Sequence, residues 1–124
     1  CLYNYWYAKE HIIKSGVIVL VESPGNVWRL EEAGIHNSVA IFGAYLSDNQ
    51  KKIIDASGAF SIVCLLDQDE AGKNGTQKIY EQCSKMYRLY SPQFEQNDIG
   101  DIDADVVTSD IKPLISKIGE AYYG

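Results

Sequence analysis

Three carboxylates follow directly on an apolar run in the middle of the chain. The run "SIVCLL" ends at Asp67, and Asp69 and Glu70 come next; a second run, "GVIVLV", ends in the same way at Glu22. Side chains two residues apart leave an extended strand on the same side, so Asp67 and Asp69 are expected to point together. Clustered carboxylates raise each other's pKa unless a cation compensates them, and Mg²⁺ prefers oxygen ligands. The pattern therefore predicts a site for a hard divalent cation.

Other chemistries suit this pattern less well. Zinc is disfavoured because no histidine or cysteine lies near Asp67 and Asp69 with ligand spacing. His11 and His36 are distant from these acids in the sequence, and we expect them to be surface or helix-end residues. Phosphatases of the haloacid dehalogenase type have threonine or valine where this chain has Ala71, and receiver domains place their paired acids on the first strand rather than the third. The segment "SPGN" is too short for a Walker phosphate loop.

Segments of two kinds alternate along the chain and must position these acids. Short apolar runs rich in β-branched residues are typical of strands buried on both faces. These runs are 16–21, 38–42 and 60–66, with 86–90 as a weaker fourth candidate. The predicted helices are 1–15, 26–34, 47–58, 71–86 and 106–124. The alternation predicts one α/β domain over residues 1–124, with about four mainly parallel strands and helices on both faces.

Strand order decides whether the acids meet. In open parallel sheets, sites form beyond the carboxyl ends of the strands, where the strand order reverses. If the first and third strands are neighbours, as in the order 2-1-3-4, Glu22, Asp67 and Asp69 lie in one crevice. Gly72 is expected to let the chain turn at once into the next helix. The acidic segment 91–105 is either a solvated loop or a functional one.

The composition excludes some classes of protein and leaves others open. The net charge of −6 argues against a simple electrostatic nucleic-acid binder, although bound divalent cations would reverse the local sign. No apolar run approaches the ~20 residues of a membrane span. Cys64 is expected to be a core residue, and the three cysteines contain no C-x-x-C pair, which favours a reducing, cytoplasmic setting. The clusters "YNYWY" and "YY" are predicted to be packing surfaces, with base stacking as an alternative.

Five motifs in order along the chain resemble one known family, the Toprim domain of bacterial and phage-type DNA primases. They are "LYNYWYA", "VESPGNVWRLEEAGI", "VAIFGAYLSDNQ", "LLDQDEAGKNGT" and "NDIGD". A glutamate after the first strand and D-x-D after the third are the signature of Toprim domains generally, and "DEAGK" is similar to the primase branch in particular. The resemblance implies a Toprim, Rossmann-like fold.

The resemblance also implies roles for particular residues. Glu22 is similar to the family's general acid/base or metal-proximal glutamate. Asp67 and Asp69 resemble its ligands for Mg²⁺ or Mn²⁺, and Asp98 resembles a later aspartate that supports metal binding. Lys73 matches a basic residue that contacts phosphate. These five positions form the implied catalytic, metal and phosphate site.

Three positions depart from the family pattern. Ser23 replaces the glycine that usually follows the glutamate, and Gln68 replaces the glycine between the aspartates. The family often has an acid four residues beyond the glutamate, where this chain has Asn26. These departures bear on the number of metal ions more than on the fold, and the residues alone give no physical account of Gln68.

The function implied is primer synthesis. A primase Toprim domain catalyses Mg²⁺-dependent nucleotidyl transfer, joining nucleoside triphosphates into RNA primers on single-stranded DNA during replication, with a replicative helicase as a further partner. Because family primases add other domains and this chain starts at Cys1, we expect an excised part of a longer protein with little activity alone. Two other functions stay open: a Toprim nuclease that hydrolyses phosphodiesters, and a noncatalytic Toprim module that binds a partner.

Overall fold

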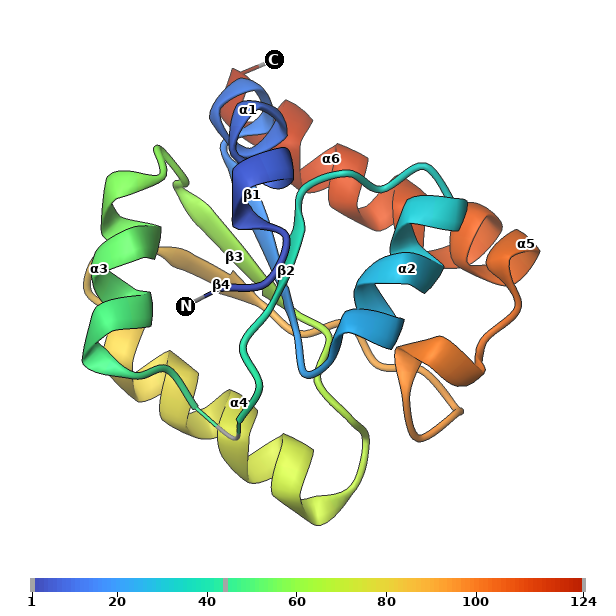
Figure 1. The fold of residues 1–124 in the computed structure, drawn as a ribbon. Helices are drawn as coiled ribbons and strands as arrows, with labels where there is room; N and C mark the ends of the chain where they lie inside the picture. The colour runs from blue at the N-terminus through green and yellow to red at the C-terminus, as the bar shows by residue number, and fades with distance from the viewer. Residues whose placement is uncertain (1, 44, 124) are drawn as a thin grey trace.

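Four parallel strands form a single sheet in the order β2-β1-β3-β4 (Figure 1). The computed structural model describes residues 2–43 and 45–123. The strands are β1 (Val17–Val21), β2 (Ser38–Ala40), β3 (Ser61–Cys64) and β4 (Arg88–Tyr90). This is the order under which Glu22, Asp67 and Asp69 were expected to share a crevice, and each strand lies inside the apolar run predicted for it. The first and third strands are therefore neighbours, as the carboxylate site requires.

Helices cover both faces of this sheet (Figure 1). They are α1 (Tyr5–Ser15), α2 (Pro24–Glu32), α3 (Asp48–Ala56), α4 (Glu70–Cys83), α5 (Ala104–Val106) and α6 (Lys112–Tyr123), with a 3₁₀ turn at Ile99–Asp101 and a π-helical turn at Val107–Ile111. Alternate residues of each strand enter separate cores because successive side chains point to opposite faces. Val17, Val19 and Val21 pack with α2 and the C-terminal helices, whereas Ile18 and Leu20 pack with α1, α3 and α4.

The two terminal helices differ from their expected ranges for local reasons. The helix expected over 1–15 begins at Tyr5, because Tyr3 exchanges two backbone hydrogen bonds with Ala40, of 3.1 and 3.2 Å. The helix expected over 106–124 begins at Ala104 and widens into the π-helical turn. Pro113 has no N–H and so cannot donate to the carbonyl four residues earlier. The N–H of Lys112 donates to the carbonyl of Val107, five residues earlier, which is the spacing of a π-helix. Cys1 and Gly124 lie outside the described residues.

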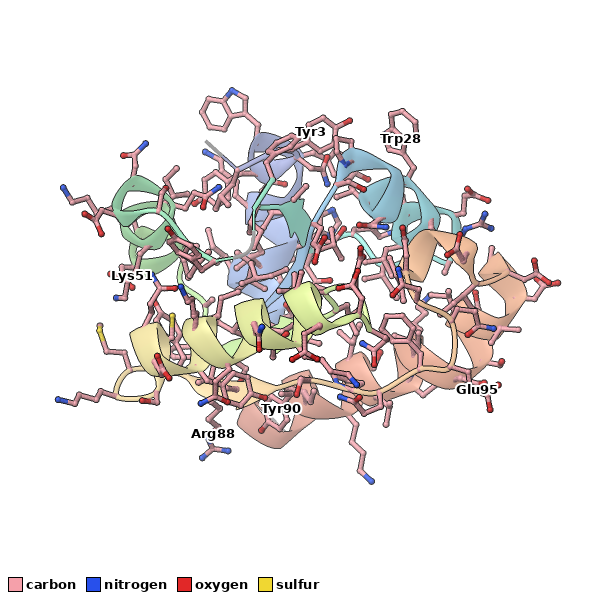
Figure 2. The ribbon with its side chains drawn as sticks, turned by 90° about the horizontal axis from the view of Figure 1, so that it is seen from below. Tyr3, Trp28, Lys51, Arg88, Tyr90 and Glu95 are labelled. Carbon is pink, nitrogen blue, oxygen red and sulfur yellow. The ribbon has the colours of Figure 1, made fainter. Side chains whose placement is uncertain are left out.

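The aromatic cluster "YNYWY", which runs into the first turn of α1, is only partly a packing surface. Tyr3 and Tyr5 pack against the two cores, but Trp6 is 81% exposed and Tyr7 is 54% exposed. Tyr3 also accepts a hydrogen bond of 3.1 Å from the indole N–H of Trp28 (Figure 2). The side chains of the second cluster, "YY", are not described. No described helix has the length and apolar character that crossing a membrane would need.

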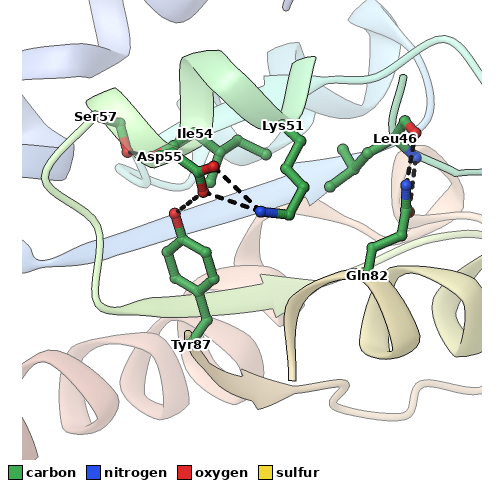
Figure 3. A network of polar contacts seen from close by, with 7 residues as sticks. All are labelled: Leu46, Lys51, Ile54, Asp55, Ser57, Gln82 and Tyr87. Carbon is green, nitrogen blue, oxygen red and sulfur yellow. Dashed lines mark hydrogen bonds and ion pairs between the residues drawn. The ribbon is translucent and has the colours of Figure 1, made fainter. Parts of the chain in front are cut away.

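A polar network fastens α3 to the end of α4 and to β4 (Figure 3). Tyr87 donates to Asp55 at 2.5 Å, and Lys51 approaches the same carboxylate at 3.1 Å. Gln82 exchanges hydrogen bonds of 2.8 and 3.3 Å with the backbone of Leu46. The hydrogen bond from Tyr87 lowers the pKa of Asp55, and burial together with Asp55 raises the pKa of Tyr87. The pair is therefore strongest with Asp55 ionised and Tyr87 neutral.

Tyr87→Phe should destabilise the chain at pH 7 by about 1 kcal/mol, the usual net value of a hydrogen bond, or somewhat more because one partner is charged. Because the folded pKa of Asp55 is depressed, its contribution is present above the unfolded value near 3.8 and is lost as the pH falls through the folded value. Urea unfolding at pH 7 and pH 3 measures the difference. An equal loss at both pH values would contradict a role for the ionised Asp55.

Candidate metal centre

Glu22 and Asp67 meet at the carboxyl edge of the sheet. Glu22 follows β1 directly, and Asp67 comes three residues after the end of β3. The neighbouring ladder continues past the strand, since Leu65 donates to the Leu20 carbonyl at 2.9 Å. The Asp67 backbone N–H then donates to Glu22 Oε1 at 3.3 Å. The structure thus brings together two of the acids that the sequence placed in one crevice.

Burial, together with the neighbouring carboxylates, raises the pKa of the Asp67 carboxyl to about 7. Those neighbours are Glu22, Asp98 and Asp69, in order of effect, and Glu22 also hydrogen-bonds the Asp67 side chain. Each of these influences, all from described residues, raises the pKa of Asp67. No described side chain among these causes therefore balances the negative charge of ionised Asp67. The carboxylates that oppose its ionisation are the other predicted site residues.

Asp69 is oriented differently from the expectation. Because β3 ends at Cys64, Asp67 and Asp69 do not leave an extended strand side by side. Asp69 is the N-cap of α4, and its Oδ1 accepts a hydrogen bond of 2.8 Å from the Gly72 N–H. A carboxylate satisfies a helix N-terminus well, because the first N–H groups have no partner within the helix. One Asp69 oxygen thus serves the fold, and the second remains available at an exposed position.

Asp98 reaches the site from the loop after β4. Its Oδ1 accepts hydrogen bonds from the Asn26 side-chain amide at 2.5 Å and from the Gly100 N–H at 2.6 Å. The same loop is tied to the D-x-D segment, because Gln68 N–H donates to the Asn97 carbonyl at 2.6 Å. The acidic segment 91–105 is therefore joined to the carboxylate centre by direct hydrogen bonds, which favours the functional reading of this loop.

Asn26 is a site residue that sequence reasoning treated only as a missing acid. It is 3% exposed, and its Oδ1 accepts hydrogen bonds from the Ser23 N–H at 3.0 Å and the Ser23 hydroxyl at 3.1 Å. Its amide thus links the start of α2 to Asp98. The spacing Ser23-x-x-Asn26 is that of a capping box, and this signal could have identified the side chain as structurally engaged.

Gly72 is needed for close approach rather than for a turn, which corrects the expectation from the sequence. It is buried in the first turn of α4, where a Cβ atom would lie 1.9 Å from the Asp67 carbonyl oxygen. Lys73, the next residue, has an exposed side chain and forms no ion pair with a described residue. Lys73 and Asp67 line one cleft, so a free cation and the acid face a common space.

The donor set suits a hard divalent cation in charge and in atom type. Carboxylate oxygens are the preferred ligands of Mg²⁺, and the raised pKa of Asp67 marks charge that a cation would neutralise. Within residues 2–43 and 45–123, however, no three His, Cys, Asp or Glu side chains are grouped to hold a metal ion. Mg²⁺ usually keeps several waters and uses one or two carboxylates with substrate phosphates. The residues therefore fit an Mg²⁺ or Mn²⁺ ion that a phosphate-bearing substrate helps to bind.

Asn26→Asp should destabilise the metal-free chain, because it replaces the amide that donates to Asp98 with a second carboxylate at hydrogen-bond distance. Like charges this close oppose folding, and we expect a loss of about 2 kcal/mol at pH 8 in EDTA. Thermal melts with and without Mn²⁺ measure it. Mn²⁺ should restore more stability to Asn26→Asp than to wild type, since the variant has an added anionic ligand. Equal stability in EDTA would contradict the Asn26–Asp98 contact.

The fold and the site together define an α/β domain whose carboxylate centre is divided between the ends of the first and third strands. Residues 16–90 match the Toprim domain family. Because this match covers more than half of the chain, the chain belongs to the Toprim domain family. The four-stranded parallel sheet with helices on both faces confirms the fold class expected from the sequence.

The curated relatives with assigned names are DNA primases. The chain is 29% identical over 102 residues to the DNA primase of Helicobacter pylori (strain 26695), covering 82% of the chain and 18% of that protein. It is 27% identical over 125 residues to the DNA primase of Aquifex aeolicus, covering 98% of the chain and 24% of that protein. The chain therefore spans about a fifth to a quarter of these primases.

Solved primase structures have the same fold. The zinc-binding and RNA polymerase domains of the Aquifex aeolicus primase superpose with a TM-score of 0.71 at 24% identity, covering 97% of the chain and 29% of that structure. A DNA primase domain from Pseudomonas aeruginosa superposes with a TM-score of 0.70 at 22% identity, covering 94% of the chain and 36% of that structure. A primase catalytic domain bound to single-stranded DNA superposes with a TM-score of 0.67 at 18% identity, covering 97% of the chain and 39% of that structure. These likenesses confirm the primase-type Toprim fold.

Proposed function

We propose that this chain is the catalytic Toprim domain of a DNA primase and takes part in Mg²⁺- or Mn²⁺-dependent synthesis of RNA primers on single-stranded DNA. The observation that supports this most is the uncompensated carboxylate pair Glu22–Asp67 at the carboxyl edge of β1 and β3. It occurs in a chain of the Toprim family whose curated relatives with assigned names are DNA primases. The template, the nucleoside triphosphates and a replicative helicase would be partners of the longer protein, in a cytoplasmic setting.

The proposed roles follow from what each side chain can do. Asp67 and Asp69 would hold the cation, with Asp98 in support, and the bound cation would neutralise triphosphate charge and acidify the attacking hydroxyl. Glu22 would accept the proton of the primer 3′-hydroxyl, since a positioned carboxylate can act as a general base. Lys73, which forms no ion pair with a described residue, would bind a phosphate through its positive charge. Asn26 and Gly72 would be positioning residues, acting through Asp98 and Asp67.

Primer synthesis by the full-length protein tests the proposal. Incorporation of labelled ribonucleotides on single-stranded DNA should require Mg²⁺ or Mn²⁺ and stop in EDTA. Glu22→Gln should reduce the rate about 100-fold or more, the usual effect of losing a general base. Calorimetry measures Mn²⁺ binding by the chain itself. The Mn²⁺ affinity should weaken in Asp69→Asn. It should persist in Glu22→Gln if Glu22 acts as a general base rather than as a ligand.

Two results would replace this proposal with another function. Metal-dependent nicking of DNA without nucleotide incorporation would favour the Toprim nuclease. Absence of Mg²⁺ or Mn²⁺ binding by both the chain and the full-length protein would favour a noncatalytic, partner-binding module. Residues 1–124 alone should show little synthesis, and robust primer synthesis by them would contradict the dependence on further domains.

A further inference from the structure

A cleft of about 230 Å³ opens beside Asp67, beyond the carboxyl ends of β3 and β4. The first turns of α4 form one wall, and the segment that follows β4 forms the other. Asp67 is its one acidic lining residue among those described, although the chain has 17 acidic residues. The remaining polar side chains of the lining are amides, hydroxyls and Lys73. The cleft is thus a nearly uncharged space attached to a carboxylate centre.

Three glutamine side chains give this cleft its hydrogen-bonding capacity. Gln68 Nε2 donates to the Leu66 carbonyl at 3.2 Å, and Gln93 Nε2 donates to the Ser91 carbonyl at 3.0 Å. Each of these amides is oriented by that bond, while its oxygen accepts no hydrogen bond from a described residue. The Gln77 side chain is exposed and forms no hydrogen bond with the described part of the chain. Acceptors and donors are therefore left for a ligand.

The hydroxyl groups of the cleft are engaged within its walls. Thr76 Oγ1 donates to the Gly72 carbonyl at 3.0 Å, and the Tyr80 hydroxyl donates to Ser91 Oγ at 3.1 Å. The second bond joins α4 to the segment after β4 and so fixes the width of the cleft. Because the hydroxyls hold the walls, the glutamines are the groups that can recognise a ligand.

We propose that this cleft binds the base and sugar of a nucleotide whose triphosphate lies at the carboxylate centre, with Gln68 as a residue that hydrogen-bonds the base. An amide offers a donor and an acceptor side by side, as the edge of a nucleobase does, and glutamine can pair with a base through two hydrogen bonds. Lys73 and Asp67 share the same cleft, which places a cation and the proposed metal ligand beside the bound nucleotide. This inference rests on the proposed function and adds the nucleotide position to it.

A nucleoside bound in this cleft gives the Gln68 side chain a physical role. The usual glycine at this position has no side chain, so it could neither orient an amide on the Leu66 carbonyl nor offer an acceptor to a base. The cleft is smaller than the ~300–1,000 Å³ typical of pockets for drug-sized ligands. It therefore suits the nucleoside part of a single nucleotide rather than a stacked strand.

Calorimetry with two matched ligands tests this assignment. The chain is titrated with ATP and with inorganic tripolyphosphate, both with saturating Mn²⁺, so that the two ligands differ by the nucleoside. ATP should bind about 10-fold more tightly or better. Gln68→Gly and the double variant Gln77→Ala/Gln93→Ala should each weaken ATP binding about 5- to 10-fold, the value of one or two hydrogen bonds, and leave tripolyphosphate unchanged. Lys73→Ala should weaken both ligands.

Gln96→Ala is the matched control, because Gln96 is an exposed amide of the same loop that does not line the cleft. It should leave both affinities unchanged. The glutamines at 77 and 93 are exposed, so their replacement tests the cleft without threatening the fold. Equal affinity of ATP and tripolyphosphate, or ATP binding that is indifferent to all three glutamines, would overturn the inference and leave the proposed function standing. Failure of both ligands to bind with Mn²⁺ would overturn the proposed function as well.

Discussion

Asp67→Asn should stabilise the metal-free chain and abolish its binding of Mn²⁺. Asp67 has a folded pKa of about 7 against an ordinary value of 3.8, so the folded chain binds this proton more tightly than the unfolded chain does. Stability contributed by protonated Asp67 is therefore fully present below about pH 4 and is lost as the pH rises through 7. Above that value, ionised Asp67 opposes folding. Asparagine removes that charge and keeps nearly the same shape.

The expected gain depends on pH in a way that identifies its cause. At pH 8 in EDTA, Asp67→Asn should raise the free energy of unfolding by about 1–2 kcal/mol, after discounting for the partial exposure of the carboxyl. At pH 4 the gain should vanish, because wild-type Asp67 is protonated there in the folded state. Thermal melts at the two pH values measure this. Glu95→Gln is the control, since it removes an equal charge from an exposed position of the loop after β4 (Figure 2).

Mn²⁺ should reverse the order of stability. Wild type gains stability from any ion that binds only the folded chain, whereas Asp67→Asn lacks a proposed ligand and should gain little. A melt of wild type with saturating Mn²⁺ should therefore reach or exceed that of the variant. If Asp67→Asn is destabilising in EDTA at pH 8, or if it retains wild-type Mn²⁺ affinity, then repulsion among these carboxylates is not the property that prepares the site for a cation.

The strands could be predicted because each depends on a local signal, whereas their order entered the sequence analysis only as a condition. "GVIVLV" and "SIVCLL" are apolar on both faces, as a sheet covered by helices on both sides requires, and they became β1 and β3. The helix predicted over 47–58 begins at Asp48 after its N-cap Ser47, and both hydrogen bonds of a capping box between Ser47 and Gln50 are present. Placing Glu22 beside Asp67 then needed only the strand order.

The rest of the site depends on contacts that no local pattern reports. The bond between Asn26 and Asp98 joins residues 72 positions apart. Asp69, a proposed ligand of the cation, is also the residue that caps α4, and the cap determines where its Oδ1 points. The sequence shows which residue types are present but not which of two physical demands each one meets.

Gly72→Ala should be the most damaging small substitution near the site. An added Cβ would lie 1.9 Å from the Asp67 carbonyl oxygen and 2.7 Å from its carbon, and both are backbone atoms that no side-chain rotation can move. Either the first turn of α4 or the Asp67 segment must shift. A forced shift of packed backbone costs about 3 kcal/mol or more, which we expect in urea unfolding. Gly25→Ala is the matched control, because its nearest neighbour would be 3.9 Å away in the first turn of α2.

The same substitution separates two explanations of this glycine. If Gly72 served only to let the chain turn, alanine would be neutral or would stabilise the chain by up to about 1 kcal/mol, because Gly72 lies within α4 and alanine favours helices. If it permits close approach, Gly72→Ala must also move Asp67 away from Glu22 and disturb the Gly72 N–H bond to Asp69. Mn²⁺ affinity should then fall with stability in Gly72→Ala, whereas Gly25→Ala should retain both. If Gly72→Ala is destabilised but keeps the Mn²⁺ affinity of wild type, then the first turn of α4 has shifted and the carboxylates have kept their positions.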